Sequence, residues 1–209
     1  MASSTAAPPD WSAPHTWTAR YAARPGTHDW YIDAAALLPS VAPLLSRADD
    51  FEVLIPGCGT SALPAALYAA GFRNLSCIDR CAGVVAAMAA RYAELADMDY
   101  SVLDATALGD ALPDACFDLV LDKALLDALA CGRGGGGGGS AAAGAPALVA
   151  EMHRVLKPGG RYCVVSHAPP EARLPYLAAP QLGWQPRVTE LRGRGGKPCF
   201  LYVCTKPDL

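Results

Sequence analysis

The chain has 209 residues, enough for one domain that buries a hydrophobic core without disulfides or metals. Hydrophobic residues make up 52 % of the sequence and charged residues 18 %, a composition that excludes an intrinsically disordered protein. The formal net charge is −3 and Lys and Arg form no run, so direct binding of nucleic acid is not expected.

The sequence gives no sign of export or membrane insertion. Residues 1–15 are rich in Ala, Pro and Ser but lack the basic start and apolar core of a signal peptide. No apolar stretch reaches the ~18 residues that a membrane span needs. The cysteines lack Cys-x-x-Cys spacing and are interpreted as buried thiols of a reducing compartment. We therefore expect a cytoplasmic monomer that binds no metal and no membrane.

The first clear element is an apolar strand at 53–55, which runs directly into the glycine turn 57–59. Two glycines let the backbone turn tightly and leave no Cβ between it and a ligand. Ser61 can cap the helix that follows, and Gly71 can end it. The pattern predicts a strand–turn–helix unit that approaches a ligand through its backbone.

Acidic residues follow the next two predicted strands. The second strand, 75–78, ends at Asp79, and the third, 100–103, ends at Asp104. A carboxylate after the second strand is where a ribose diol is bound in nucleotide-binding folds. We therefore predict a nucleoside-bearing cofactor, with its sugar at Asp79 and its base near Asp104 and Ala105.

The rest of the chain alternates between strands and helices. The predicted elements are a helix at 82–92, a strand at 117–121 closing on Asp122 and Lys123, a helix at 124–130, a helix from Pro146 that stops at 157–160, a strand at 162–166, a helix at 171–178, and strands at 185–191 and 199–205. Residues 132–144 contain six consecutive glycines and are predicted to be a flexible insertion.

This order predicts an α/β fold, with a Rossmann-like seven-stranded sheet that is mostly parallel and carries helices on both faces. The last two strands are joined by a connection too short for a parallel crossover, so they should form an antiparallel C-terminal hairpin. We expect one domain over 1–209, in which residues 1–50 form an N-terminal helical segment.

The glycine turn alone does not identify the cofactor, because it also fits nicotinamide-binding enzymes. A chain of 209 residues leaves no room for the second nucleotide-binding half and the substrate domain of a dehydrogenase. Five parallel strands followed by a hairpin are instead similar to the plan of methyltransferases that use S-adenosyl-L-methionine. We therefore favour methyl transfer over hydride transfer.

Four segments point to a narrower group. They are Trp17-x-x-Arg20-Tyr21, Asp29-Trp30, the loop Gly-Cys-Gly-Thr-Ser at 57–61, and Asp-Lys-Ala-Leu-Leu-Asp-Ala-Leu at 122–129. Together they resemble the small eukaryotic methyltransferases that modify lysines of translation elongation factor 1-alpha, and the resemblance covers about 17–206. This chain departs from the group's usual residues at 16, 28, 29, 60, 124 and 125.

The resemblance implies an S-adenosyl-L-methionine-dependent enzyme with a protein substrate, elongation factor 1-alpha. The residues predicted to bind the cofactor are Trp17, Tyr21, Trp30, Gly57, Gly59, Asp79, Arg80, Asp104, Ala105 and Lys123. By resemblance, the aromatic residues fold over from the N-terminal segment to cover the methionine end, and Lys123 closes the other side. As alternatives, the tryptophans could be packing anchors and Lys123 a surface lysine.

Asp122 and Asp127 are predicted to orient the acceptor amine, because the loop after the fourth strand should open onto the transferred methyl group. The alternative for Asp127 is a helix cap or a local ion pair. His167, directly after the fifth strand, is interpreted as a rim residue. Two other functions stay open: methylation of a small molecule on nitrogen, oxygen or sulfur, and a non-catalytic partner protein that keeps the methyltransferase fold.

Overall fold

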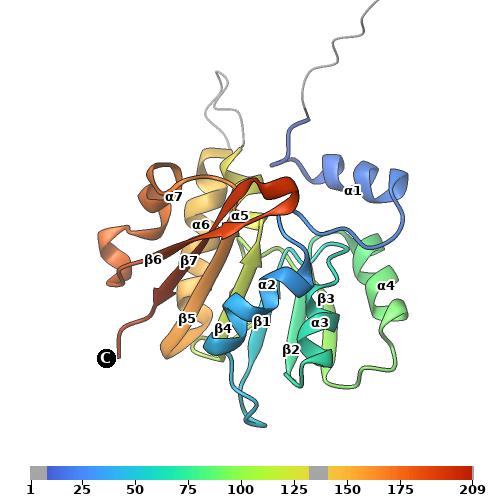
Figure 1. Cartoon of the computed structure of the whole chain (residues 1–209), viewed down its shortest axis with the longest axis horizontal. Coiled ribbons are helices and arrows are strands. Elements are labelled where there is room, and N and C mark those ends of the chain that lie inside the picture. Colours follow the sequence, from blue (N-terminus) through green and yellow to red (C-terminus); the bar gives the residue numbers. More distant parts are fainter. Residues whose placement is uncertain (1–8, 132–140, 209) are drawn as a thin grey trace, which may run out of the picture.

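The computed structural model of the chain describes residues 9–131 and 141–208 (Figure 1). Residues 132–140, which form most of the predicted flexible insertion, lie outside the described residues. Residues 141–144 were predicted to belong to that insertion, but they begin helix α6, Ala141–Val155. Alanines at 141–143 favour a helix, and Pro146 in its second turn removes only one backbone hydrogen bond. The prediction that this helix starts at Pro146 is therefore wrong.

The described residues form one seven-stranded sheet in the order β3-β2-β1-β4-β5-β7-β6. The strands are β1 Val53–Pro56, β2 Leu75–Asp79, β3 Met98–Val102, β4 Phe117–Lys123, β5 Leu156–Ser166, β6 Arg187–Arg192 and β7 Pro198–Thr205. Strands β1 to β5 pair in parallel, and β7 pairs antiparallel with both β5 and β6. The predicted fold class and the C-terminal hairpin are confirmed.

Helices cover both faces of this sheet, and one further helix, α1 Pro14–Ala23, lies beyond its edge. The other helices are α2 Ala34–Val41, α3 Leu63–Ala69, α4 Ala82–Arg91, α5 Leu125–Ala130, α6, and α7 Pro170–Leu177. Short 3₁₀ turns lie at Ala42–Leu44, Gly109–Ala111, Pro180–Leu182 and Arg194–Gly196.

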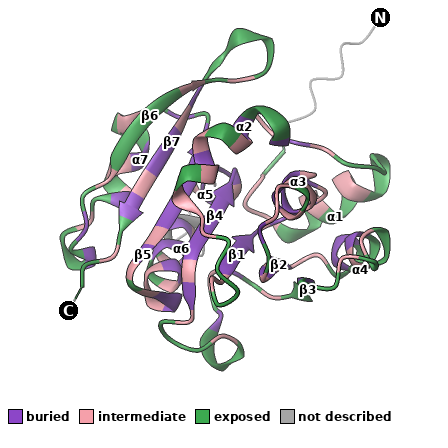
Figure 2. Ribbon diagram, turned by 60° about the horizontal axis from the view of Figure 1, so that its bottom comes forward, coloured by how far each residue is buried: buried purple, intermediate pink, exposed green. Residues whose placement is uncertain are grey.

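Alternation along the central strands divides the core into two parts. Side chains of successive strand residues point to opposite faces of a sheet. Thus Val53 and Ile55 pack with α2 and α3, whereas Leu54 packs with α5, α6 and α7. Figure 2 shows β1 and β4 as almost wholly buried and β6, at the sheet edge, as mostly exposed. Apolar residues on both faces of the central strands therefore hold the layers together.

One strand boundary differs from the prediction. Residues 157–160 were expected to precede the fifth strand, but β5 already pairs with β4 at Leu156 and resumes at Arg161. Residues 157–160 form a bulge, in which Gly159 adopts a φ of +73°. The Gly159 N–H donates to the carbonyl of Lys206 at 3.0 Å. The bulge is held by hydrogen bonds with Lys206, directly after the last strand, which a local pattern does not reveal.

The parallel register places the carboxyl ends of the strands at one edge of the sheet. Pro56 of β1 lies beside Ile78, and Lys123 of β4 lies beside Val165. Helix α1 lies beyond this edge, next to the loops that leave β1 and β2 (Figure 1). Ligands of open parallel sheets bind at such an edge, so the fold positions a site there.

Candidate functional site

A cavity of about 270 Å³ lies between the carboxyl edge of the sheet and the N-terminal segment. This volume is close to the lower end of the ~300–1,000 Å³ of typical small-molecule sites. The cavity is lined by all ten residues that the sequence assigns to the cofactor: Trp17, Tyr21, Trp30, Gly57, Gly59, Asp79, Arg80, Asp104, Ala105 and Lys123. Residues from five separate stretches of the chain are thus brought together around one space.

The glycine turn forms part of the cavity wall. Gly57 has a φ of +59° and Gly59 a φ of +51°, in the left-handed region that side chains other than glycine rarely adopt. A Cβ on Gly57 would lie 3.0 Å from the side chain of Leu125, and one on Gly59 would lie 2.7 Å from the hydroxyl of Tyr21. Backbone conformation and space therefore both require glycine at these two positions.

The two carboxylates that follow β2 and β3 differ in their surroundings. Asp79 is buried and accepts N–H groups from Gly59 at 3.0 Å and from Cys81 at 2.9 Å. Burial nevertheless keeps the pKa of Asp79 above its ordinary value. Asp104 is exposed, and its Oδ1 accepts the N–H and the hydroxyl of Thr106. The other oxygen of Asp104 has no hydrogen-bond partner in the part of the chain that the structure describes.

Lys123 does not project freely into the cavity. Its Nζ lies 2.9 Å from Asp29 Oδ1, and the two side chains are 4 % and 8 % exposed. Ser61, which stands just before the N-cap of α3, accepts the N–H of Leu63 and donates its hydroxyl to Asp29. Burial lowers the pKa of Lys123, although the Asp29 charge opposes this shift. The pair joins the N-terminal segment to the end of β4. Asp29 was not among the site residues predicted from sequence.

Aromatic rings from the N-terminal segment form the outer wall. The ring of Trp17 lies 5.1 Å from that of Trp11 and 6.0 Å from that of Trp30. The Arg20 guanidinium stacks on Trp30 at 4.4 Å from the ring centroid, and it donates no hydrogen bond within the described residues. Trp11 also lines the cavity and was missed, because it precedes the segments that carry the family resemblance.

Asp122 lies beneath the cavity, not in it. The residue is 0 % exposed, and its carboxylate accepts the N–H groups of Leu125 and Leu126 and the hydroxyl of Tyr162. Burial raises the pKa of Asp122 to about 7. The expected contact between Asp122 and an acceptor amine does not fit this position, because the carboxylate is turned to the first turn of α5.

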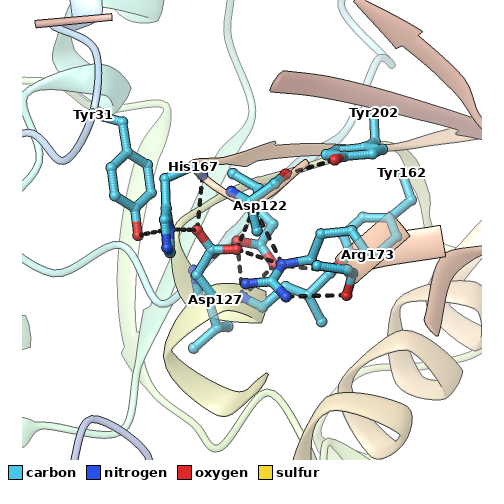
Figure 3. A network of polar contacts seen from close by, with 12 residues as sticks. Tyr31, Asp122, Asp127, Tyr162, His167, Arg173 and Tyr202 are labelled. Atoms are coloured by element: carbon cyan, nitrogen blue, oxygen red, sulfur yellow. Dashed lines mark hydrogen bonds and ion pairs between the residues drawn. The ribbon is translucent and has the colours of Figure 1, made fainter. Parts of the chain in front are cut away.

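Asp127 belongs to a buried polar network at the end of β5 (Figure 3). It is 2 % exposed and accepts hydrogen bonds from Arg173 Nε at 2.8 Å, from the Ser166 hydroxyl, and from the N–H and Nδ1 of His167. Burial works to raise the pKa of Asp127, but these groups together lower it to about 2. Asp127 is therefore ionised, and the direct contact with an acceptor that was predicted for it does not fit its burial.

The described residues also bear on metal binding and on membrane insertion. None of their His, Cys, Asp and Glu side chains form a group of three or more that could hold a metal ion. In the same ranges, no helix is both long and apolar enough to cross a membrane.

Comparisons with known proteins find methyltransferases. A family model described as a methyltransferase domain matches residues 54–164. The mouse protein EEF1A lysine methyltransferase 4 is 34 % identical over 177 residues, covering 83 % of this chain and 68 % of that protein. The human mitochondrial citrate synthase-lysine N-methyltransferase is 30 % identical over 194 residues, covering 85 % of this chain and 78 % of that protein.

A solved structure shares the fold. The N-methyltransferase NodS of Bradyrhizobium japonicum, in complex with S-adenosyl-L-homocysteine, is similar with a TM-score of 0.61. The match covers 83 % of this chain and 85 % of that one at 16 % identity, so it supports the fold alone.

Proposed function

The chain belongs to the methyltransferase family and uses S-adenosyl-L-methionine, and we propose that the group it methylates is a lysine side chain of a protein. The observation that carries the cofactor half of this proposal is the convergence of ten predicted residues on one cavity. When bound, the cofactor supplies a methyl group on a positively charged sulfur, which is already a good leaving group.

The residues present fit this cofactor. Asp79, at the end of β2, lines the cavity and can accept ribose hydroxyls. The oxygen of Asp104 that has no hydrogen-bond partner among the described residues can accept the adenine amino group. The glycine turn leaves room for the amino-acid part at 57–59. The Arg20 guanidinium has donors available for its carboxylate. The rings of Trp17 and Trp30, in the outer wall of the cavity, can stabilise a sulfonium cation through cation–π interaction.

The acceptor class follows from the relatives. Two of them, from mouse and human, are both named as lysine methyltransferases, although their names give different acceptor proteins. Both names give lysine as the residue that is methylated. We propose elongation factor 1-alpha as the acceptor, because the relative named for it is the more similar of the two, at 34 % against 30 % identity.

The test uses the full chain with tritiated S-adenosyl-L-methionine. Purified elongation factor 1-alpha, purified citrate synthase and the low-mass fraction of a lysate are offered separately as acceptors. We expect label on a lysine of elongation factor 1-alpha, located by mass spectrometry of its peptides. Label confined to citrate synthase would correct the acceptor protein, and label confined to small molecules would overturn the lysine proposal.

Calorimetry with the same cofactor completes this experiment. Cofactor binding without methyl transfer to any of the three acceptors would favour the alternative of a non-catalytic partner protein. The variant Arg91→Met serves as a control, because Arg91 is exposed on α4 and does not line the cavity. It should bind cofactor and transfer methyl groups as the unaltered chain does.

A further inference from the structure

A second cavity lies near the first at the carboxyl edge of the sheet. It is lined by Tyr31, His167, Arg194, Gly195, Lys197 and Pro198. Trp30 lines the first cavity and Tyr31 the second, with their rings 6.1 Å apart. Lys123, in the wall of the first, pairs with Val165 of β5, two residues before His167. The two cavities therefore occupy neighbouring positions at one sheet edge.

The imidazole of His167 is oriented by the network beneath it (Figure 3). Its Nδ1 lies 2.6 Å from Asp127 Oδ2, while the His167 backbone N–H donates to the same oxygen at 3.0 Å. A nitrogen this close to an ionised carboxylate carries the proton in the neutral ring. Nε2 is then the unprotonated nitrogen, and it has no hydrogen-bond partner among the residues of 9–131 and 141–208.

We propose that the second cavity admits the acceptor lysine and that His167 Nε2 accepts the proton of its ammonium group. In this assignment His167 is a catalytic residue and Asp127 is a positioning residue that fixes the ring tautomer. The inference rests on the proposed function, because it needs an amine acceptor. It also explains why Asp127 is buried beside the second cavity but does not line it.

The chemistry requires a neutral amine. With an ordinary pKa of about 10.4, roughly one lysine in 2,500 is neutral at pH 7. Transfer of one N–H proton to Nε2 leaves the lone pair on the amine nitrogen. That lone pair would form the new bond to the methyl carbon as the bond from this carbon to the cofactor sulfur breaks, with S-adenosyl-L-homocysteine as the leaving group. The resulting imidazolium returns the proton to water, since the His167 side chain is 51 % exposed. One proton is released for each methyl group added.

Charged and titratable groups from several elements face His167. Asp127 from α5 accepts the Nδ1 proton of His167, and Arg173 from α7 binds that same carboxylate. Tyr31 places its hydroxyl 3.1 Å from Nδ1. Arg194 and Lys197 of the β6–β7 connection line the same cavity, and their positive charges disfavour an additional cation in it. Arg194 is itself paired with Asp33.

The first test compares His167→Gln with the unaltered chain and with His15→Gln, a matched change at an exposed histidine outside both cavities. With elongation factor 1-alpha as acceptor, we expect kcat of His167→Gln at pH 7 to fall about 50-fold while the Kd for the cofactor stays unchanged. Its kcat should then rise tenfold for each pH unit up to about pH 9. A pH profile parallel to that of the unaltered chain would overturn the proposal.

The second test needs no protein acceptor, so it separates this inference from the proposed function. Nitrogen-15 NMR of the histidine rings should show the proton of His167 on Nδ1, and titration with n-butylamine should shift the His167 resonances but not those of His15. If elongation factor 1-alpha is not methylated, but the His167 proton is on Nδ1 and n-butylamine shifts the His167 resonances, only the proposed acceptor fails. A proton on Nε2, or no response of His167 to the amine, would overturn the assignment.

The role of Asp127 is tested by Asp127→Asn in the same spectra. We expect the proton to redistribute to Nε2 and kcat to fall about tenfold with the cofactor Kd unchanged. An unchanged tautomer in the folded variant would remove Asp127 as the positioning residue. If the variant does not fold, the tautomer of the unaltered chain and the pH profile of His167→Gln decide the proposal.

Discussion

The ammonium of Lys123 lies 2.9 Å from the carboxylate of Asp29, and this buried pair fastens the segment before α2 to the end of β4. Removing one partner leaves a buried charge without compensation, which costs several kcal/mol. We therefore expect Asp29→Asn to lower the free energy of unfolding by about 3 kcal/mol. Urea unfolding followed by circular dichroism at pH 7 measures this difference.

The double variant Asp29→Leu with Lys123→Met tests whether the loss comes from the unpaired charge. Replacing both partners by apolar side chains removes the desolvation cost, so the double variant should be more stable than Asp29→Asn alone. Asp99→Asn, at an exposed carboxylate of β3, should change little. A double variant less stable than the single one would contradict this account.

Gly59 should tolerate no side chain. Its left-handed backbone makes an alanine cost about 1–2 kcal/mol, and the new Cβ would lie 2.7 Å from the Tyr21 hydroxyl. We expect Gly59→Ala to weaken cofactor binding at least tenfold in calorimetry and to lower stability. Combining it with Tyr21→Phe removes the collision and should restore part of the stability, measured against Tyr21→Phe alone.

Gly83 provides the control for this substitution. It lies in α4 with a negative φ, and a Cβ there would have no atom within 4 Å. Gly83→Ala should therefore raise stability by about 0.5–1 kcal/mol without changing cofactor affinity. Equal cofactor affinities in Gly59→Ala and Gly83→Ala would exclude the glycine turn from the binding site.

The wall of the first cavity could be predicted from sequence because its determinants are local. Each strand end supplies its own acidic or glycine residue, and parallel pairing alone brings these ends together. Asp79 and Asp104 reach the cavity for this reason. The polar network could not be predicted, because Asp127 meets Arg173 across 46 residues of sequence. A carboxylate near a strand end looks the same in sequence whether it faces a ligand or, like Asp122, a helix.

Arg20 is expected to contribute to cofactor affinity. Its guanidinium lies over Trp30 and donates no hydrogen bond within the described ranges, so its donors are available to a carboxylate. A hydrogen bond between charged groups is worth about 1.5–3 kcal/mol. Arg20→Met, which keeps an unbranched side chain over the ring, should raise the Kd for the cofactor at least tenfold. Calorimetry against Arg91→Met checks this, and equal Kd values would contradict it.

Asp122 should make stability depend on pH. Burial raises the pKa of this carboxyl to about 7, whereas in the unfolded chain it is about 3.9. Because the folded pKa is the higher one, the stability that this group contributes is fully present below about pH 4 and is lost as the pH rises toward 7. About three pH units correspond to roughly 4 kcal/mol.

Asp122→Asn isolates this contribution, because an amide does not ionise and its single oxygen, in the place of Oδ1, can still accept the N–H of Leu125 and, at 3.4 Å, that of Leu126. The unaltered chain should lose stability relative to Asp122→Asn between pH 4 and pH 7, and the difference should level off above pH 8. Urea unfolding of both proteins at several pH values gives the difference directly, so that titration of all other groups cancels. A difference independent of pH would mean that Asp122 is ionised throughout this range, with the two N–H groups and the Tyr162 hydroxyl outweighing its burial.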